Sequence, residues 1–213
     1  MYPTKTKLLI AILVMGVTAI VSEEFAPLWV YGVFKITTTL LVLLLASSNK
    51  QISRLGARVF VALFFCLFGD IALLWEDGFL VGLGFFLVAH LLFIRAFKAR
   101  FRITIHWMAL LTVFGIAGTC LYFILPNVDQ LLQIAILGYV SILSIMSTLS
   151  MSIGLSRKTK YSLQLAIGGL LFMVSDALLG INAFVNPIPF ASILILSTYW
   201  GAITYLANAV REF

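Results

Sequence analysis

Residues 59–75 read VFVALFFCLFGDIALLW and hold a single charged side chain, that of Asp70. An α-helix needs roughly 17–25 mostly apolar residues to cross a bilayer, so this stretch predicts a membrane-spanning helix. A carboxylate inside such a helix is costly to insert and normally faces a partner or a watery cavity. The stretch therefore predicts both a membrane fold and a polar site within it.

The rest of the chain repeats this pattern. Of its 213 residues, 62% are hydrophobic and 10% are charged, whereas a soluble domain has about 25% charged residues. Apolar runs lie at about residues 8–21, 29–47, 59–75, 79–97, 103–125, 131–155, 163–184 and 190–210. We therefore predict an all-α membrane protein, a bundle of eight transmembrane helices that forms a single transmembrane domain over residues 1–213. The short connections predict that consecutive helices are antiparallel neighbours.

The charged residues predict how the bundle is oriented. With both termini cytoplasmic, the inner segments hold 13 of the 14 basic residues, and the outer connections hold none of them. These 13 are Lys5, Lys7, Lys50, Arg54, Arg58, Arg95, Lys98, Arg100, Arg102, Arg157, Lys158, Lys160 and Arg211. The outer connections instead hold acidic residues, namely Glu23, Glu24, Glu76, Asp77 and Asp129. By the positive-inside rule, we predict cytoplasmic termini and a bacterial cytoplasmic (inner) membrane, and nucleic acid is not needed as a partner.

Four ionisable residues remain inside helices once the loop charges are set aside: Lys35, Asp70, His90 and Asp176. A rise of about 1.5 Å per residue puts the first, second and fourth in the outer half of the bilayer and His90 near its midplane. We expect an outward-opening cavity with the three charges at its mouth and His90 toward its floor. Simpler interpretations stay open: Lys35 snorkels to the interface, Lys35 and Asp70 form a structural ion pair, or His90 makes an interhelical hydrogen bond.

Helical spacing predicts which side chains share a face. Tyr31, Lys35, Thr38 and Thr39 follow an i, i+4, i+7, i+8 pattern and form a polar stripe. The glycine pair at residues 168–169 predicts a close approach of its helix to a neighbour. Aromatic residues expected at the membrane interfaces are Trp29, Tyr31 and Trp75 on the outer side and Trp107 on the inner side.

Two motifs surround the aspartates. The first is FGDIALL at residues 68–74, followed by Phe79-x-x-Gly82-Leu83-x-x-Phe86-x-x-Ala89-His90. The second is Ser175-Asp176-x-Leu178-Leu179-x-x-Asn182-x-Phe184. Both resemble the YhhN family of membrane proteins, bacterial relatives of the animal lysoplasmalogenases, and Lys35 matches a lysine of that family's second helix. The family's tyrosine-rich C-terminal motif maps to Tyr199-Trp200 or to residues 205–208.

The resemblance implies that the chain cleaves the vinyl ether bond of a lysoplasmalogen, giving a fatty aldehyde and glycerophospho-ethanolamine or glycerophospho-choline. It implies no metal and no other cofactor. Protonation of the β-carbon of a vinyl ether forms an oxocarbenium ion that water captures, which calls for an acid and a negative charge. We predict Asp176 as the acid and Asp70 as the base and stabiliser, and the reverse assignment stays open. The predicted substrate-binding residues are Lys35, His90, Asn182 and Tyr199, and the predicted partners are a lysophospholipid substrate and membrane lipid.

Two other functions remain open from the sequence. The alternative is a proton-coupled lipid or small-molecule transporter or flippase, because such carriers also use buried carboxylates, lysines and histidines. Against a carrier, the prolines at residues 27, 126, 187 and 189 lie at predicted helix ends rather than breaking a helix near the charges. A structural lipid-binding protein is a third possibility, and it would tolerate asparagine at both aspartates. The oligomeric state is left open.

Overall fold

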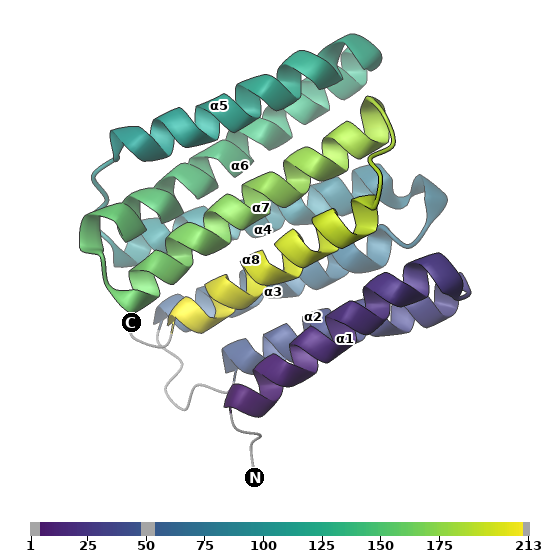
Figure 1. Ribbon diagram of the computed structural model, residues 1–213. Coiled ribbons are helices and arrows are strands. Elements are labelled where there is room, and N and C mark those ends of the chain that lie inside the picture. The colour runs from purple at the N-terminus through teal and green to yellow at the C-terminus, as the bar shows by residue number, and fades with distance from the viewer. Residues whose placement is uncertain (1–4, 48–53, 211–213) are drawn as a thin grey trace.

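The computed structural model describes residues 5–47 and 54–210, so the predicted inner-side residues Lys50 and Arg211 lie outside the described residues. The described chain forms eight α-helices and two 3-10 turns, with no strand (Figure 1). The α-helices are α1 (Lys5–Phe25), α2 (Leu28–Ser47), α3 (Arg54–Ala72), α4 (Phe79–Arg100), α5 (Trp107–Ile124), α6 (Gln130–Arg157), α7 (Lys160–Phe184) and α8 (Ala191–Ala209). The turns are η1 (Glu76–Gly78) and η2 (Leu125–Asn127). The predicted eight helices are therefore confirmed.

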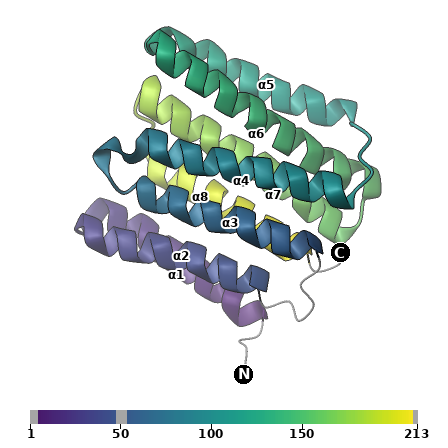
Figure 2. The ribbon, with the colours of Figure 1, turned by 180° about the vertical axis from the view of Figure 1, so that it is seen from behind.

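The helices pack in two layers, which Figures 1 and 2 show from opposite sides. One layer contains α5, α7, α8 and α1, and the other contains α6, α4, α3 and α2. The prediction that consecutive helices are neighbours is wrong for α4 and α5, because α5 packs against α6 and α7 while α4 packs against α3 and α6. Between them, residues 101–106 are not helical, and the backbone N–H of His106 donates to Ser152 Oγ of α6 at 3.0 Å. This connection carries the chain past α6 before α5 begins.

Local sequence sets where the helices begin and end. Thr159 and Ser162 form a capping box at the start of α7, each side chain accepting from the other's backbone N–H. Helix α3 ends at Ala72, three residues before the predicted end at Trp75. The chain turns there so tightly that a Cβ on Gly78 would lie 1.8 Å from the carbonyl oxygen of Ala72. Only glycine fits at this turn, which also ends the apolar run.

Small residues bring α7 close to two neighbours. Gly168 faces α8, where an added Cβ would lie 2.8 Å from Leu206. Gly169 faces α6, where an added Cβ would overlap the side chain of Ser150. The hydroxyl of Ser147 also donates to the Gly169 carbonyl oxygen at 3.0 Å. The predicted close approach is confirmed, and it fixes α7 between α6 and α8.

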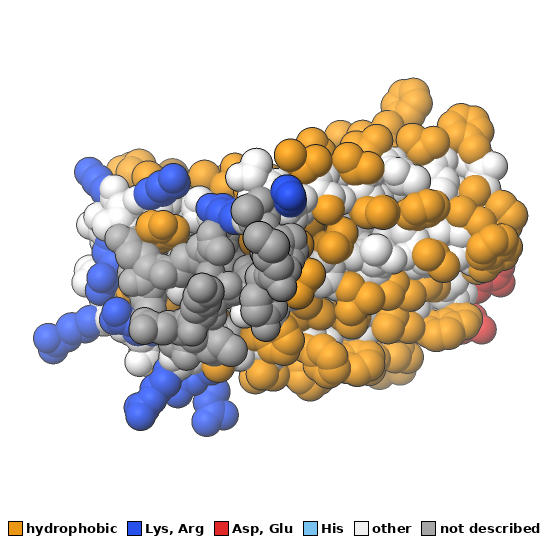
Figure 3. Space-filling model, turned by 90° about the horizontal axis from the view of Figure 1, so that it is seen from below, with side chains coloured by type: hydrophobic (Ala, Val, Ile, Leu, Met, Phe, Trp, Pro, Cys, Tyr) orange, Lys and Arg blue, Asp and Glu red, His pale blue; other side chains and the backbone are white. Residues whose placement is uncertain are grey.

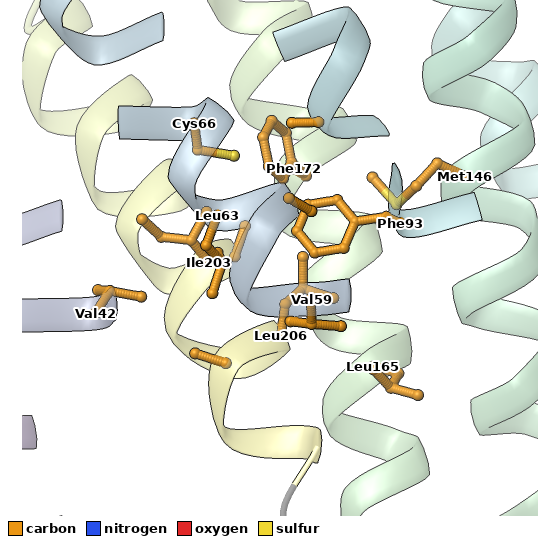
Figure 4. Packing of buried hydrophobic residues seen from close by; sticks show 14 of the residues in the cluster. Val42, Val59, Leu63, Cys66, Phe93, Met146, Leu165, Phe172, Ile203 and Leu206 are labelled. Carbon is orange, nitrogen blue, oxygen red and sulfur yellow. The ribbon is translucent and has the colours of Figure 1, made fainter. Parts of the chain in front are cut away.

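A buried apolar core lies between the layers, in which large side chains such as Phe93, Phe172 and Leu206 pack together (Figure 4). Within the described residues, seven helices, α1 to α7, are long and apolar enough to cross a membrane. Helix α8 has 19 residues but does not reach the same apolarity. It packs against α7, α1, α2 and α3, so fewer of its side chains need to suit lipid.

Charge is separated along the helix axes. On the face in Figure 3, lysine and arginine side chains gather at one end and acidic side chains at the other, with hydrophobic side chains between. Helix α1 begins and helix α8 ends at the basic end (Figure 1). Trp29, Trp75 and Trp107 are exposed, as expected near an interface. Tyr31 is buried, because its face of α2 points into the bundle.

Candidate active site

A cavity of about 580 Å³ opens at the acidic end of the bundle and reaches between α2, α3, α7 and α8. Five of the six predicted site residues line this cavity, namely Lys35, Asp70, Asp176, Asn182 and Tyr199. Its mouth is formed by helix ends and connections, including Glu23 at the end of α1 and Glu76 in η1. The fold thus brings aspartates from two distant helices to one space.

Asp70 is held by side chains of α2 and α8. Its Oδ2 atom accepts hydrogen bonds from the hydroxyls of Thr39 at 2.6 Å and Tyr199 at 2.8 Å. The indole N–H of Trp200 donates to Thr39 Oγ1 at 3.3 Å, which links α8 to α2. All four members of the predicted polar stripe of α2 are buried, so the stripe is confirmed, and Thr39 is the member that contacts the aspartate.

A small residue precedes each aspartate, and each makes a close contact between helices. An added Cβ on Gly69 would lie 2.7 Å from the ring of Phe86 on α4, so only glycine lets this ring sit against α3 beside the cavity. On α7, the hydroxyl of Ser175 donates to the carbonyl oxygen of Ile195 at 3.0 Å and joins α7 to α8. These contacts fix the backbone on which each carboxylate stands.

Asp176 is held from α6. The hydroxyl of Tyr139 donates a hydrogen bond to its Oδ2 atom. Tyr139 was not among the predicted site residues. The signal for it was a phenol in the middle of an apolar helix, since a buried tyrosine hydroxyl usually finds a hydrogen-bond partner. Each aspartate therefore has a tyrosine donor from another helix, and Asp70 has an additional donor in Thr39.

Lys35 is 4% exposed and lines the cavity one turn deeper than Tyr31, whose ring centroid lies 5.4 Å from its Nζ atom. Within the described part of the chain, no ion pair joins Lys35 to a carboxylate and no hydrogen bond holds its ammonium group. Neither snorkelling into solvent nor a direct Lys35–Asp70 ion pair therefore describes this side chain. The cavity holds a buried ammonium group that faces open space.

His90 is the predicted site residue that does not line the cavity. It is fully buried on α4, with its ring centroid 4.6 Å from that of Phe172 and 5.5 Å from that of Tyr139. Neither ring nitrogen has a hydrogen-bond partner among the described residues, so the interhelical hydrogen bond is not formed either. No group of three His, Cys, Asp or Glu side chains within residues 5–47 and 54–210 could hold a metal ion.

Asn182 and Tyr199, the remaining predicted substrate-binding residues, make different contacts at the cavity wall. The side-chain oxygen of Asn182 accepts from the backbone N–H of Ile188 at 2.8 Å and so fixes the connection from α7 to α8 at the cavity wall. Of the two C-terminal tyrosines considered for the site, Tyr199 contacts Asp70. Tyr205 is 38% exposed and borders a different groove, between α1 and α8.

An apolar slot continues from the cavity past Asp176, between α4, α5, α6 and α7. It shares Phe79, Asp176 and Leu179 with the cavity and encloses about 40 Å³. Apart from Asp176 and Tyr139, its lining is apolar and includes Ile124 and Gly180. Asp176 therefore stands at the junction between a polar cavity and an apolar slot.

The packed helices of the described residues, with two buried carboxylates beside one cavity, define a polytopic α-helical membrane protein with a polar site inside its helix bundle. Sequence similarity gives the family: the model of the YhhN family matches residues 30–210, and the chain belongs to this family. No solved structure matches the chain.

Relatives of the chain carry names that state an activity, and three of them are described next. Lysoplasmalogenase TMEM86A of Bos taurus is 31% identical over 163 residues, which cover 74% of this chain and 66% of the relative. Lysoplasmalogenase TMEM86B of Sus scrofa is 27% identical over 187 residues, covering 87% of this chain and 77% of the relative. Lysoplasmalogenase TMEM86A of Homo sapiens is 30% identical over 162 residues, covering 74% of this chain and 66% of the relative. The chain thus spans just under two thirds of the length of the two TMEM86A relatives.

Proposed function

We propose that this chain is a lysoplasmalogenase, an integral membrane hydrolase that cleaves the vinyl ether bond of a lysoplasmalogen into a fatty aldehyde and glycerophospho-ethanolamine or glycerophospho-choline. The observation that carries the proposal is the pair Asp70 and Asp176, which line one cavity and are each held by a tyrosine of another helix. The names of the relatives point to the same activity.

The proposed reaction begins with proton transfer from the carboxylic acid of Asp176 to the β-carbon of the vinyl ether. The resulting oxocarbenium ion is stabilised by the carboxylate of Asp70, which then takes a proton from water as the water oxygen bonds to the cationic carbon. The hemiacetal collapses when its hydroxyl proton returns to Asp176 and Asp70 gives its proton to the departing glycerol oxygen. Both aspartates end in their starting forms, and one water is consumed.

The surroundings of the two aspartates support this division of roles. Asp70 accepts two hydrogen bonds and shares its cavity with Lys35, and donors and a nearby cation favour a carboxylate. Asp176 has one hydroxyl donor and borders the apolar slot, an environment that favours a neutral acid. Because their environments differ, one carboxyl group can stay protonated as the acid while the other stays ionised as the base.

The polar cavity and the apolar slot suit the two ends of the substrate. Lys35 is proposed to hold the phosphate, because it is a buried ammonium group facing the cavity. The first carbons of the alkenyl chain are proposed to enter the slot beyond Asp176, which encloses about 40 Å³ and so holds only a short part of the chain. This would put the vinyl ether bond at the junction between the two spaces. Asn182 and Tyr199 line the cavity where the glycerol part would lie.

The basic end of the bundle is proposed to face the cytoplasm of a bacterial inner membrane, in accordance with the positive-inside rule. The cavity would then open toward the outer side, since its mouth is formed at the acidic end. A lysophospholipid in the outer leaflet could reach this mouth with its headgroup.

The test is aldehyde release from lysoplasmenyl-ethanolamine and lysoplasmenyl-choline by the purified protein in detergent. Detergent provides neither a gradient nor a closed membrane, so a carrier would release no aldehyde there. We expect turnover by the unaltered chain. Asp70→Asn and Asp176→Asn should each lose on the order of a hundredfold or more, because a positioned acid or base contributes that much. Both variants must match the unaltered chain in melting temperature and gel-filtration profile. If the folded, unaltered chain releases no aldehyde from either lipid, the hydrolase proposal is wrong, and transport or binding of a related lipid becomes the leading hypothesis.

A further inference from the structure

A groove of about 460 Å³ between α1 and α8 has no part in the proposed reaction. No described residue lines both this groove and the cavity that holds the aspartates. Trp200 lies between the two spaces: it lines the groove, and its indole N–H donates to Thr39, which contacts Asp70. The groove is therefore a separate space, behind one wall of the candidate active site.

The groove is polar at one end. Gln164, Thr204 and Asn208 line this end together with Lys5, where α1 and α7 begin and α8 ends. The side-chain amide of Asn208 donates to Gln164 Oε1 at 2.7 Å, but Asn208 Oδ1 and Thr204 Oγ1 are buried and have no hydrogen-bond partner among the described residues. Asn208 is only 6% exposed. Because an unpaired buried polar atom costs free energy, these two atoms point to a ligand that carries polar groups.

The rest of the groove is mainly apolar and suits a hydrocarbon chain. One face of α1 forms its wall between Leu9 and Ile20, and Val17 on this wall is 53% exposed, so the groove is open to the surrounding lipid. Between Asn208 and Ser197 the groove runs about 16 Å along α8. One leaflet of a bilayer has roughly 15 Å of hydrocarbon. An acyl chain that enters at the polar end would therefore reach the middle of the membrane.

The charge at the polar end indicates which kind of lipid fits. Lys5 lines the groove, and Lys160 lies one turn before Gln164 on α7, on the same side of that helix. The acidic residues of α1, Glu23 and Glu24, lie at its opposite end, and α8 carries no charged side chain. Basic pockets between membrane helices bind the headgroups of anionic lipids. The groove thus has an apolar length and a basic, hydrogen-bonding end.

We propose that this groove binds one anionic phospholipid from the leaflet at the basic end of the bundle. One acyl chain lies between α1 and α8, and the phosphate meets Lys5. The hydroxyl of Thr204 donates to an ester oxygen of the lipid, and Asn208 Oδ1 accepts from a headgroup hydroxyl. A headgroup that adds an ammonium group would bring a like charge to the basic end, which disfavours it. The site is distinct from the substrate cavity and does not depend on the proposed reaction.

Lipid binding to the purified, delipidated chain in a non-ionic detergent tests the charge of the site. The probes are phosphatidylglycerol and phosphatidylcholine with the same acyl chains, and their dissociation constants come from the rise in melting temperature as each lipid is titrated. Phosphatidylglycerol should bind more tightly. Lys5→Gln should reduce this preference by roughly two- to fivefold, as expected for an exposed charge pair. The control is Lys7→Gln, because Lys7 is exposed on the same helix but does not line the groove, and it should leave the preference unchanged.

A second pair of variants tests the place of the acyl chain. Val14 and Val17 are both 53% exposed on α1, but only Val17 lines the groove. Val17→Phe puts a ring where the chain would lie, so phosphatidylglycerol binding should weaken on the order of tenfold, because packing contacts are individually small and collectively large. Val14→Phe makes the same change outside the groove and should leave binding unchanged. The lipid-free melting temperature of each variant provides its baseline.

The proposal is overturned if phosphatidylglycerol binds no more tightly than phosphatidylcholine, or if the two variants of either pair behave alike. A dimer in gel filtration that Val17→Phe dissociates would assign the groove to a second copy of the chain and would also overturn it. Selective phosphatidylglycerol binding that only Lys5→Gln and Val17→Phe weaken supports the site. Since none of these measurements uses the reaction, they stand whether or not the chain releases aldehyde.

Discussion

Replacing Tyr199 by phenylalanine removes one oxygen atom from the wall of the cavity. That oxygen donates to Asp70 Oδ2 at 2.8 Å, while the ring packs edge-on against Phe86 and Phe172 with centroid distances of 5.7 Å to each. The ring contacts survive in the variant, so the change isolates the hydrogen bond. A hydrogen bond to a charged group contributes about 1.5–3 kcal/mol. With tenfold in rate for each 1.36 kcal/mol, Tyr199→Phe should lower kcat/KM for aldehyde release by about 10- to 150-fold.

The matched control is Tyr205→Phe, which removes the same hydroxyl from the same helix at a position that is 38% exposed and outside the cavity. Its kcat/KM should stay within about twofold, as for most exposed substitutions. In an Asp70→Asn background, Tyr199→Phe should cost much less than in the unaltered chain, because the two groups act as one unit. Equal losses in the two tyrosine variants, or a folded Tyr199→Phe with full activity, would refute the role given to this hydrogen bond.

Two further predictions concern glycines at packed positions, and a third concerns metal. Gly180→Leu adds bulk where a Cβ would already lie 2.8 Å from Ile124 in the apolar slot, so kcat/KM for aldehyde release should fall. Gly138→Leu, with nothing within 4 Å of an added Cβ, should leave kcat/KM unchanged. Gly69→Ala forces its Cβ to 2.7 Å from Phe86; the overpacking cost of about 1–3 kcal/mol exceeds the gain in helix propensity, so the melting temperature in detergent should fall. Chelation with EDTA should leave aldehyde release unchanged, and a loss restored by added metal would contradict the two-carboxylate mechanism.

Residue types alone identified some of the residues that line the cavity. Lys35, Asp70 and Asp176 were identifiable because inserting an ionisable group into a membrane helix is costly, so each such residue demands an explanation. Tyr199 was reached only as one of two candidates, and its contact with Asp70 selects it over Tyr205. Tyr139 was missed, since a tyrosine within an apolar helix is compatible with both lipid and a carboxylate until its neighbours are known.

The positions of Glu23, Glu24 and His90 relative to the cavity could not be predicted from the sequence. Glu23 and Glu24 are adjacent in sequence and chemically identical, yet only Glu23 lines the cavity. His90 was expected at the floor of the cavity, but its ring packs against those of Tyr139 and Phe172 and does not line the cavity. Helical periodicity assigns a residue to a face, and it does not say which helix that face will meet.

The sequence by itself determined the number of helices, their limits to within a few residues and the separation of basic from acidic ends. These features depend on the local length of apolar runs and on where charges interrupt them, which needs no knowledge of distant residues. Only the tertiary structure decided that α5 packs beside α7 rather than α4, that both aspartates share one cavity, and that each takes a tyrosine from another helix. Those outcomes depend on how the helices are rotated and layered, and contacts between helices, such as those of Gly168 with α8 and Gly169 with α6, set this arrangement.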